Sequence, residues 1–205
     1  MYKFIWSLVL STFSLSVMAA EMSIAKSGSE GQRIIVNNNG SVLATYQGST
    51  ASFNNTLFLM LDAFGNSSND GNLTNDLMLF NDKASIVGTT INLGTFKAGT
   101  ELEFRLQSIW SSPSNAREFY SGDAARNPDG DAHARVQTNW QPGTTLVSFE
   151  DLLGGPFQFN DMSFSFTNTM AAPVPEESTL ILSMVGLVML GVSLRRKSMK
   201  SKPNV

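Results

Sequence analysis

The chain has no cysteine and only one histidine, His133. The absence of cysteine excludes thiol catalysis, thiolate zinc sites and attached haem. It is compatible with export, because a domain of this size can bury enough surface without disulfides. His133, close to Asp129 and Asp131, could be half of an acid–base pair, although such a residue is more often a structural hydrogen-bonding group. No GxSxG, HExxH or phosphate-binding loop accompanies it, so no catalytic residue is assigned.

Charged residues are scarce, at 15% of the chain. The 17 acidic and 14 basic residues give a net charge of −3, but two of the acids and six of the bases lie in the terminal segments. The part between them therefore carries about −7. Nucleic-acid binding needs the opposite sign and is excluded, whereas cations, or a matrix held together by cations, fit this charge.

Both ends of the chain indicate export. Residues 1–20 combine Lys3, an apolar stretch over residues 4–17 and small residues before position 20, which is typical of a secretory signal peptide. Residues 21–168 have the size of one domain. Residues 169–179 are predicted to be a linker with a sorting motif, residues 180–197 a transmembrane helix with a basic stop, and residues 198–205 a cytoplasmic tail.

The C-terminal segment carries a recognisable order of parts. Val174, Pro175, Glu176 and Glu177 precede an uncharged apolar run over residues 180–194, which is followed by Arg195, Arg196 and Lys197. As a helix the run would reach about 22 Å, against a hydrocarbon core of about 30 Å, with its basic end on the cytoplasmic side.

This arrangement resembles the PEP-CTERM sorting signal of Gram-negative bacteria, with Glu177 in place of the usual second proline. The resemblance implies an exosortase-like membrane enzyme as partner and delivery from the inner membrane to the cell surface or extracellular matrix. An ordinary C-terminal membrane anchor is the alternative, because any such helix with a basic flank would take this orientation.

The exported part has the pattern of strands rather than helices. Residues 32–36 and 41–46 flank an Asn-Gly turn, which predicts a hairpin, and residues 57–61 form a short apolar run. Apolar residues alternate with polar ones in two further segments, residues 101–107 and 162–167. Short strands separated by glycine and asparagine predict an all-β fold, namely a single antiparallel, jelly-roll-like β-sandwich.

Residues 149–161, FEDLLGGPFQFND, are the most informative internal stretch. Together with residues 75–80, 98–106 and 119–136, they resemble, in order, a domain of unknown function found in exported bacterial proteins. The resemblance spans about residues 57–167 and implies a β-rich module without an established activity.

The carboxylates of this stretch suggest a metal site. Hard oxygens on both sides of a Gly-Gly turn suit calcium, and four residues offer them: Glu150, Asp151, Asn160 and Asp161. Pro156 and Gln158 stand where the family has turn aspartates. The favoured alternative is that Asp151 and Asp161 accept backbone N–H bonds and tie the last hairpin together.

Three functions remain open at this point. The first is a non-enzymatic structural or interaction role at the cell surface or in the matrix. The second is a calcium-dependent carbohydrate-binding module of an exopolysaccharide, for which Trp110, Tyr120 and Trp140 could form a sugar-stacking face if they are not core residues. The third is a glycan-active enzyme. Carboxylates gathered around one loop would favour the second function, and dispersed ones the first.

Removal of residues 175–205 tests the role of the C-terminal segment. We expect the truncated protein to leave the membrane fraction and appear as soluble exported protein, because the apolar run and its basic stop are removed together. Fractionation of cells that express either form measures this. Retention of the truncated protein in membranes would show that another segment holds it there.

Overall fold

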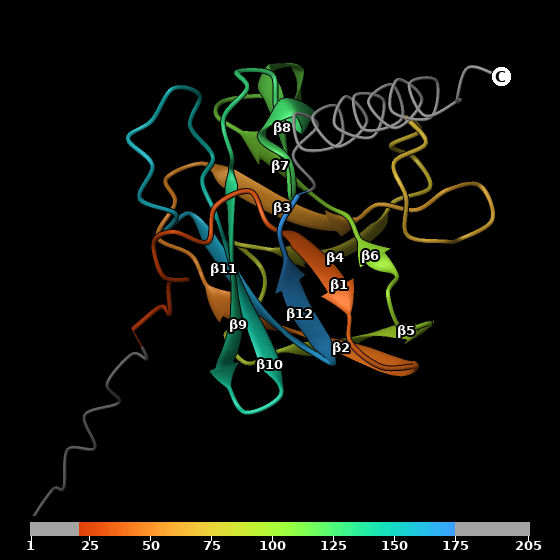
Figure 1. Ribbon diagram of the computed structural model, residues 1–205. Coiled ribbons are helices and arrows are strands. Elements are labelled where there is room, and N and C mark those ends of the chain that lie inside the picture. Colours follow the sequence, from red (N-terminus) through yellow and green to blue (C-terminus); the bar gives the residue numbers. More distant parts are fainter. Residues whose placement is uncertain (1–20, 175–205) are drawn as a thin grey trace, which may run out of the picture.

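The structure is a computed structural model that describes residues 21–174 (Figure 1). Within this range the chain forms twelve strands, two short 3-10 helices and no α-helix, which confirms the predicted all-β class. The strands are β1 (Arg33–Val36), β2 (Gly40–Gly48), β3 (Asn54–Leu59), β4 (Leu77–Asn81), β5 (Thr90–Phe96), β6 (Glu101–Leu102), β7 (Phe104–Ile109), β8 (Ala116–Tyr120), β9 (Ala134–Gln141), β10 (Thr144–Phe149), β11 (Met162–Thr167) and β12 (Thr169–Ala172). The 3-10 helices are η1 (Pro113–Asn115) and η2 (Ala124–Arg126).

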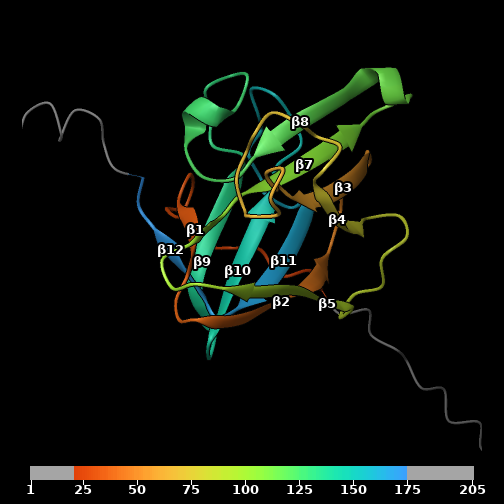
Figure 2. The ribbon, with the colours of Figure 1, turned by 90° about the vertical axis from the view of Figure 1, so that its right-hand side faces the viewer.

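The strands form three antiparallel sheets around one core (Figures 1 and 2). A five-stranded sheet has the order β5-β2-β11-β10-β9, and a four-stranded sheet has the order β4-β3-β7-β8. A three-stranded sheet, β12-β1-β6, adds Ile34, Val36 and Leu102 to the same core. The arrangement is sandwich-like, with apolar side chains of the sheets packed against one another.

Aromatic rings fill the space between the two larger sheets. Phe104 of β7 lies 4.7 Å from Phe166 of β11, and Phe80 of β4 lies 5.9 Å from Phe164, also of β11. All four side chains are at most 1% exposed. The alternation in residues 162–167 therefore places its phenylalanines in the core, as predicted, and each such ring contributes roughly 1.5–3 kcal/mol by its burial.

In the other alternating segment, residues 101–107, the predicted apolar face is confirmed. The segment is, however, divided between two sheets. Leu102, Phe104 and Leu106 are fully buried. The strand breaks at Glu103, however, because β6 pairs with β1 while β7 pairs with β3 and β8. A change of sheet at this residue lets both halves face the single core.

The alternation predicts that Arg105, on the polar face of this segment, is exposed to solvent, and this prediction is wrong. Its side chain is only 2% exposed because residues 61–76 cover the outer side of the four-stranded sheet. The Nε atom donates to Asp76 at 2.8 Å, and the guanidinium lies 4.1 Å from the centre of the Phe58 ring. A buried arginine is tolerated here because carboxylates and an aromatic face replace water.

The hairpin predicted from residues 32–46 is wrong, since its two strands belong to different sheets. β1 pairs with β12 and β6, whereas β2 pairs with β5 and β11. The Asn-rich turn bonds to Asn168 instead of closing on itself. The amide of Asn38 donates to the Asn168 side chain at 3.0 Å, and the Asn168 side chain donates to the Asn38 carbonyl at 2.8 Å.

The linker predicted from residue 169 begins later than expected, because residues 169–172 form β12. Asn168, with φ 55°, reverses the chain after β11. Thr169 then pairs with Val36 of β1, and its carbonyl accepts a hydrogen bond of 2.8 Å from the buried Thr145 hydroxyl. The strand has only four residues and no alternation of apolar and polar side chains by which it could be recognised.

The expected terminal segments lie outside the described residues, apart from Val174 at their border. These are the signal peptide, the remainder of the sorting motif, the apolar run and the basic stop. No helix within residues 21–174 is long and apolar enough to span a bilayer.

A domain that ends at residue 168 should be less stable than one that ends at residue 174. The shorter form loses the ladder between β12 and β1, and the buried Thr145 hydroxyl loses its acceptor. We expect its free energy of unfolding to be lower by about 2 kcal/mol or more. Urea unfolding of residues 21–168 and 21–174 measures the difference, and equal midpoints would contradict the role given to β12.

Candidate functional site

The candidate site lies in the loop of residues 150–161, which joins β10 to β11. Phe149 and Met162 pair across these two strands, and the amide of Asp161 donates to the Phe149 carbonyl at 3.2 Å. The first and last residues of the loop are therefore neighbours. For this reason Glu150 and Asp161, eleven positions apart in the chain, meet at the neck of the loop.

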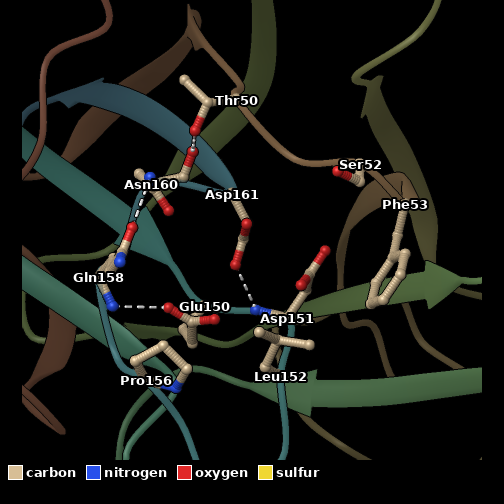
Figure 3. Close-up of a pocket in the computed structure, with 10 residues that line it drawn as sticks. All are labelled: Thr50, Ser52, Phe53, Glu150, Asp151, Leu152, Pro156, Gln158, Asn160 and Asp161. Carbon is tan, nitrogen blue, oxygen red and sulfur yellow. Dashed lines mark hydrogen bonds between the residues drawn. The ribbon is translucent and has the colours of Figure 1, made fainter.

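Two of the carboxylates hold the loop through backbone amides (Figure 3). Glu150 Oε2 accepts from the amides of Gln158 at 2.8 Å and Phe159 at 3.1 Å. Asp161 Oδ2 accepts from the amide of Asp151 at 2.8 Å. The turn-tying role predicted for Asp161 is thus confirmed, and Glu150 shares it.

Asp151 has a different role from the one predicted. Its Oδ2 atom accepts from the side-chain amide of Asn55 at 2.7 Å and from the hydroxyl of Ser108 at 3.4 Å. Asn55 and Ser108 are opposite each other on β3 and β7. Asp151 therefore connects the loop to the four-stranded sheet and does not tie its own turn.

The three acids form a compact buried cluster. Oxygens of Glu150, Asp151 and Asp161 all lie within 4.8 Å of one another, and these residues are 2%, 3% and 9% exposed. In each carboxylate the hydrogen bonds above involve one oxygen, and the carboxyl groups lie close enough for Asp161 to form side-chain hydrogen bonds with Glu150 and Asp151 when a proton is shared. None of the ion pairs formed within residues 21–174 involves the cluster.

The fourth predicted ligand, Asn160, is turned to other partners. Its side-chain amide donates to the Gln158 side chain at 3.2 Å, and its carbonyl accepts from the hydroxyl of Thr50 at 2.8 Å (Figure 3). It lines the same hollow as the acids but is not part of their cluster. The structure thus gathers three of the four predicted residues.

Burial changes the titration of two of these acids. It raises the pKa of Asp151 to about 6, against the opposing hydrogen bond from Asn55. Burial also raises the pKa of Asp161 to about 6, against the amide of Asp151 and with a further increase from Glu150. Near neutral pH, ionising Asp151 and Asp161 together without a cation therefore costs free energy.

A hollow of about 350 Å³ opens over the cluster (Figure 3). The three acids lie along it with Leu152, Pro156, Gln158 and Asn160 of the same loop and with Thr50, Ser52 and Phe53, which precede β3. Residues from two distant parts of the chain thus enclose a space that has carboxylates on one side and an aromatic ring on another.

His133 contacts the first residue of this loop without lining the hollow. Its ring is fully buried, 4.3 Å from the ring of Phe119, and its Nδ1 atom lies 3.0 Å from the Glu150 carbonyl. Its Nε2 atom lies 3.1 Å from Asp129 Oδ2. Burial raises the pKa of Asp129, but the hydrogen bonds from His133 and from the amides of Asp131 and Gly154 outweigh burial and lower it overall. These contacts support the structural role for His133.

The three aromatic residues considered for sugar stacking do not form one face. Trp110 follows the end of β7, whereas Tyr120 lies at the far end of β8, opposite Arg105. Trp140 lies near the end of β9, in the β9–β10 hairpin, which Figure 1 shows at the opposite end of the molecule from the β7–β8 hairpin. Only Trp110 is close to the candidate site, since it contacts Phe53.

Asn55, Ser108, Phe53 and Thr50 contribute to the site but were not predicted. They come from parts of the chain 40 or more positions away from the loop, and no motif marks them. The comparison with family models found no match, and neither did the comparisons with curated proteins and with solved structures.

The raised pKa values predict a pH dependence of stability. Between about pH 4 and pH 6 the folded state binds more protons at Asp151 and Asp161 than the unfolded chain does. The contribution of these acids is therefore fully present below about pH 4 and is lost as the pH rises through about 6. In Asp161→Asn, which can still accept the Asp151 amide but cannot ionise, we expect a shallower loss.

Urea unfolding of residues 21–174 between pH 4 and pH 7.5 measures this difference. Asp131→Asn is the matched control, because Asp131 is exposed and outside the cluster. Its profile should follow that of the unchanged protein. If the Asp161→Asn profile also runs parallel to that of the unchanged protein, Asp161 does not titrate as described.

Proposed function

We propose that the chain is an exported protein of the cell surface or extracellular matrix that acts by structural interaction and binding, without catalysis. In this proposal a jelly-roll-like sandwich follows the signal peptide, and an exosortase-like membrane enzyme processes the segment that begins at Val174. The helix of residues 180–197 would hold the protein in the inner membrane before delivery.

The observation that carries the binding role is the built hollow at the β10–β11 loop. Its acids are positioned by hydrogen bonds to two amides of the loop, to the Asp151 amide and to side chains of the other sheet. Such a constrained set of buried carboxylates favours recognition of a ligand, since little ordering remains to be done on binding. The only histidine, fully buried as a brace, does not line the hollow.

A second candidate function, calcium-dependent carbohydrate binding, is favoured by one specific observation. Three buried carboxylates meet with no cationic side chain of residues 21–174 paired to them. Calcium takes oxygen ligands in flexible geometry, and waters or sugar hydroxyls would complete its shell. Glu150, Asp151 and Asp161 would hold the ion.

Calcium should stabilise the domain if this second function is correct. An ion that binds only the folded state adds RT ln(1 + [L]/Kd), about 2.7 kcal/mol at a hundredfold excess over Kd. We expect millimolar calcium to raise the Tm of residues 21–174 by several degrees at pH 7.5. The rise should shrink at pH 5, because protons at Asp151 and Asp161 compete with the ion.

The controls separate a site from a general salt effect. Asp161→Asn should abolish the rise in Tm, Asp131→Asn should keep it, and magnesium at equal concentration should give a smaller one. An unchanged Tm in calcium would remove the carbohydrate-binding candidate. The interaction role would remain. Its predicted location is tested by the fractionation described above, which compares the full protein with the form without residues 175–205.

A further inference from the structure

The inner face of the four-stranded sheet continues beyond the core. Across β3, β7 and β8, one row of paired residues is Leu57, Leu106 and Phe119, all buried. The next row on the same face, two residues further along, is Asn55, Ser108 and Arg117. The face thus changes from apolar to polar at the row in which Asn55 and Ser108 donate hydrogen bonds to Asp151.

Aromatic side chains follow one step further along the same face. Phe53 precedes β3 and Trp110 follows β7, and their rings lie 6.2 Å apart. Trp110 is 70% exposed. A second hollow of about 240 Å³ lies here, lined by Phe53, Trp110, Ser108, Asn115, Arg117 and Leu152. It adjoins the acidic hollow, with which it shares Phe53 and Leu152.

Arg117 is the charged group of this second hollow. The other four arginines of residues 21–174 each form an ion pair within this part of the chain: Arg33, Arg105, Arg126 and Arg135. No ion pair or side-chain hydrogen bond of the described residues involves Arg117, which is exposed. It thus has free donors in a fork that matches a carboxylate.

We propose that this second hollow binds an acidic sugar, a hexuronate unit of a polysaccharide. The apolar face of the pyranose ring would stack on Trp110, and the sugar carboxylate would pair with Arg117 in a bidentate manner. Asn115 would donate to or accept from a ring hydroxyl. The inference rests on the binding role proposed above, but it uses residues other than the three acids and does not require calcium.

The charge of the domain makes this site selective. The exported part carries about −7, so a polyanion is repelled over most of the surface. Binding of a uronate therefore depends on the local positive charge of Arg117. A neutral sugar would stack on Trp110 but leave the guanidinium without its partner, so we expect uronates to bind more tightly than their neutral counterparts.

The test is a titration of residues 21–205, without the predicted signal peptide, in a non-glycosidic detergent. The probes are trigalacturonate and its methyl ester, which has the same rings without the charge. Calorimetry and tryptophan fluorescence, both in EDTA, report binding. We expect trigalacturonate to bind at least about tenfold more tightly than the ester, by an advantage that falls as salt is raised.

Variants assign the contacts. Trp110→Ala should weaken the binding of both probes by about tenfold or more, whereas Arg117→Gln should weaken only that of trigalacturonate and so abolish the preference. Trp140→Phe and Lys97→Gln, which change a distant tryptophan and a distant lysine, should leave affinities unchanged. Trp110 and Arg117 are exposed, so their variants should fold, which circular dichroism verifies.

Failure of this inference differs from failure of the proposed function. No preference for the charged probe, or an affinity that Trp110→Ala leaves unchanged, would overturn the uronate site even if calcium stabilises the domain. Tighter binding of an acidic aromatic peptide than of trigalacturonate would also overturn it, in favour of a protein partner. Uronate binding without any calcium effect would support the site and remove only the calcium-dependent candidate.

Discussion

The hydrogen bonds that the Asp151 carboxylate accepts from Asn55 and Ser108 join the two larger sheets at one end of the molecule. Phenylalanine rings join the sheets in the core. At this end a second polar contact lies beside that of Asp151: the hydroxyl of Ser49, which follows β2, donates at 3.3 Å to Asp82, which follows β4. Asp151 also donates its amide to Asp161 and so fixes the neck of the loop. Both hollows lie next to this link, since Phe53 and Leu152 line each of them.

Burying an acid at this link has a cost that explains the chemistry of the site. Asp151 has its amide and hydroxyl donors, but burial opposes the ionisation of Asp151 and Asp161. The nearby carboxyl groups, Asp161 beside Asp151 and Glu150 beside Asp161, add to this effect. Protons relieve the repulsion in acid, and a cation would relieve it at neutral pH. The carboxylates therefore couple stability to pH in one place, while the neighbouring aromatic hollow carries the opposite charge at Arg117.

Local patterns predicted local features, and the failures come from pairings across the chain. Alternation placed Phe104 and Phe164 correctly, because a half-buried strand needs that period. It misplaced Arg105, because the segment that covers the outer face is distant in sequence. The Asn-Gly turn suggested a hairpin, but the turn forms hydrogen bonds with Asn168, which is 130 positions from Asn38. The site shows the same division: the acids share one stretch, whereas Asn55 is 96 positions from Asp151 and nothing near it signals the contact.

The claim that separates the calcium-dependent proposal from a purely structural role is that the three acids hold a cation and are not merely ties within a turn. Anomalous diffraction from crystals of residues 21–174 grown with calcium, and with terbium as a heavier substitute, tests it most directly. The account predicts one anomalous peak in contact with oxygens of Glu150, Asp151 and Asp161, which is absent from crystals of Asp161→Asn. A cluster without a peak at saturating ion concentration and neutral pH, with its carboxyl groups bonded to one another through protons, would contradict it.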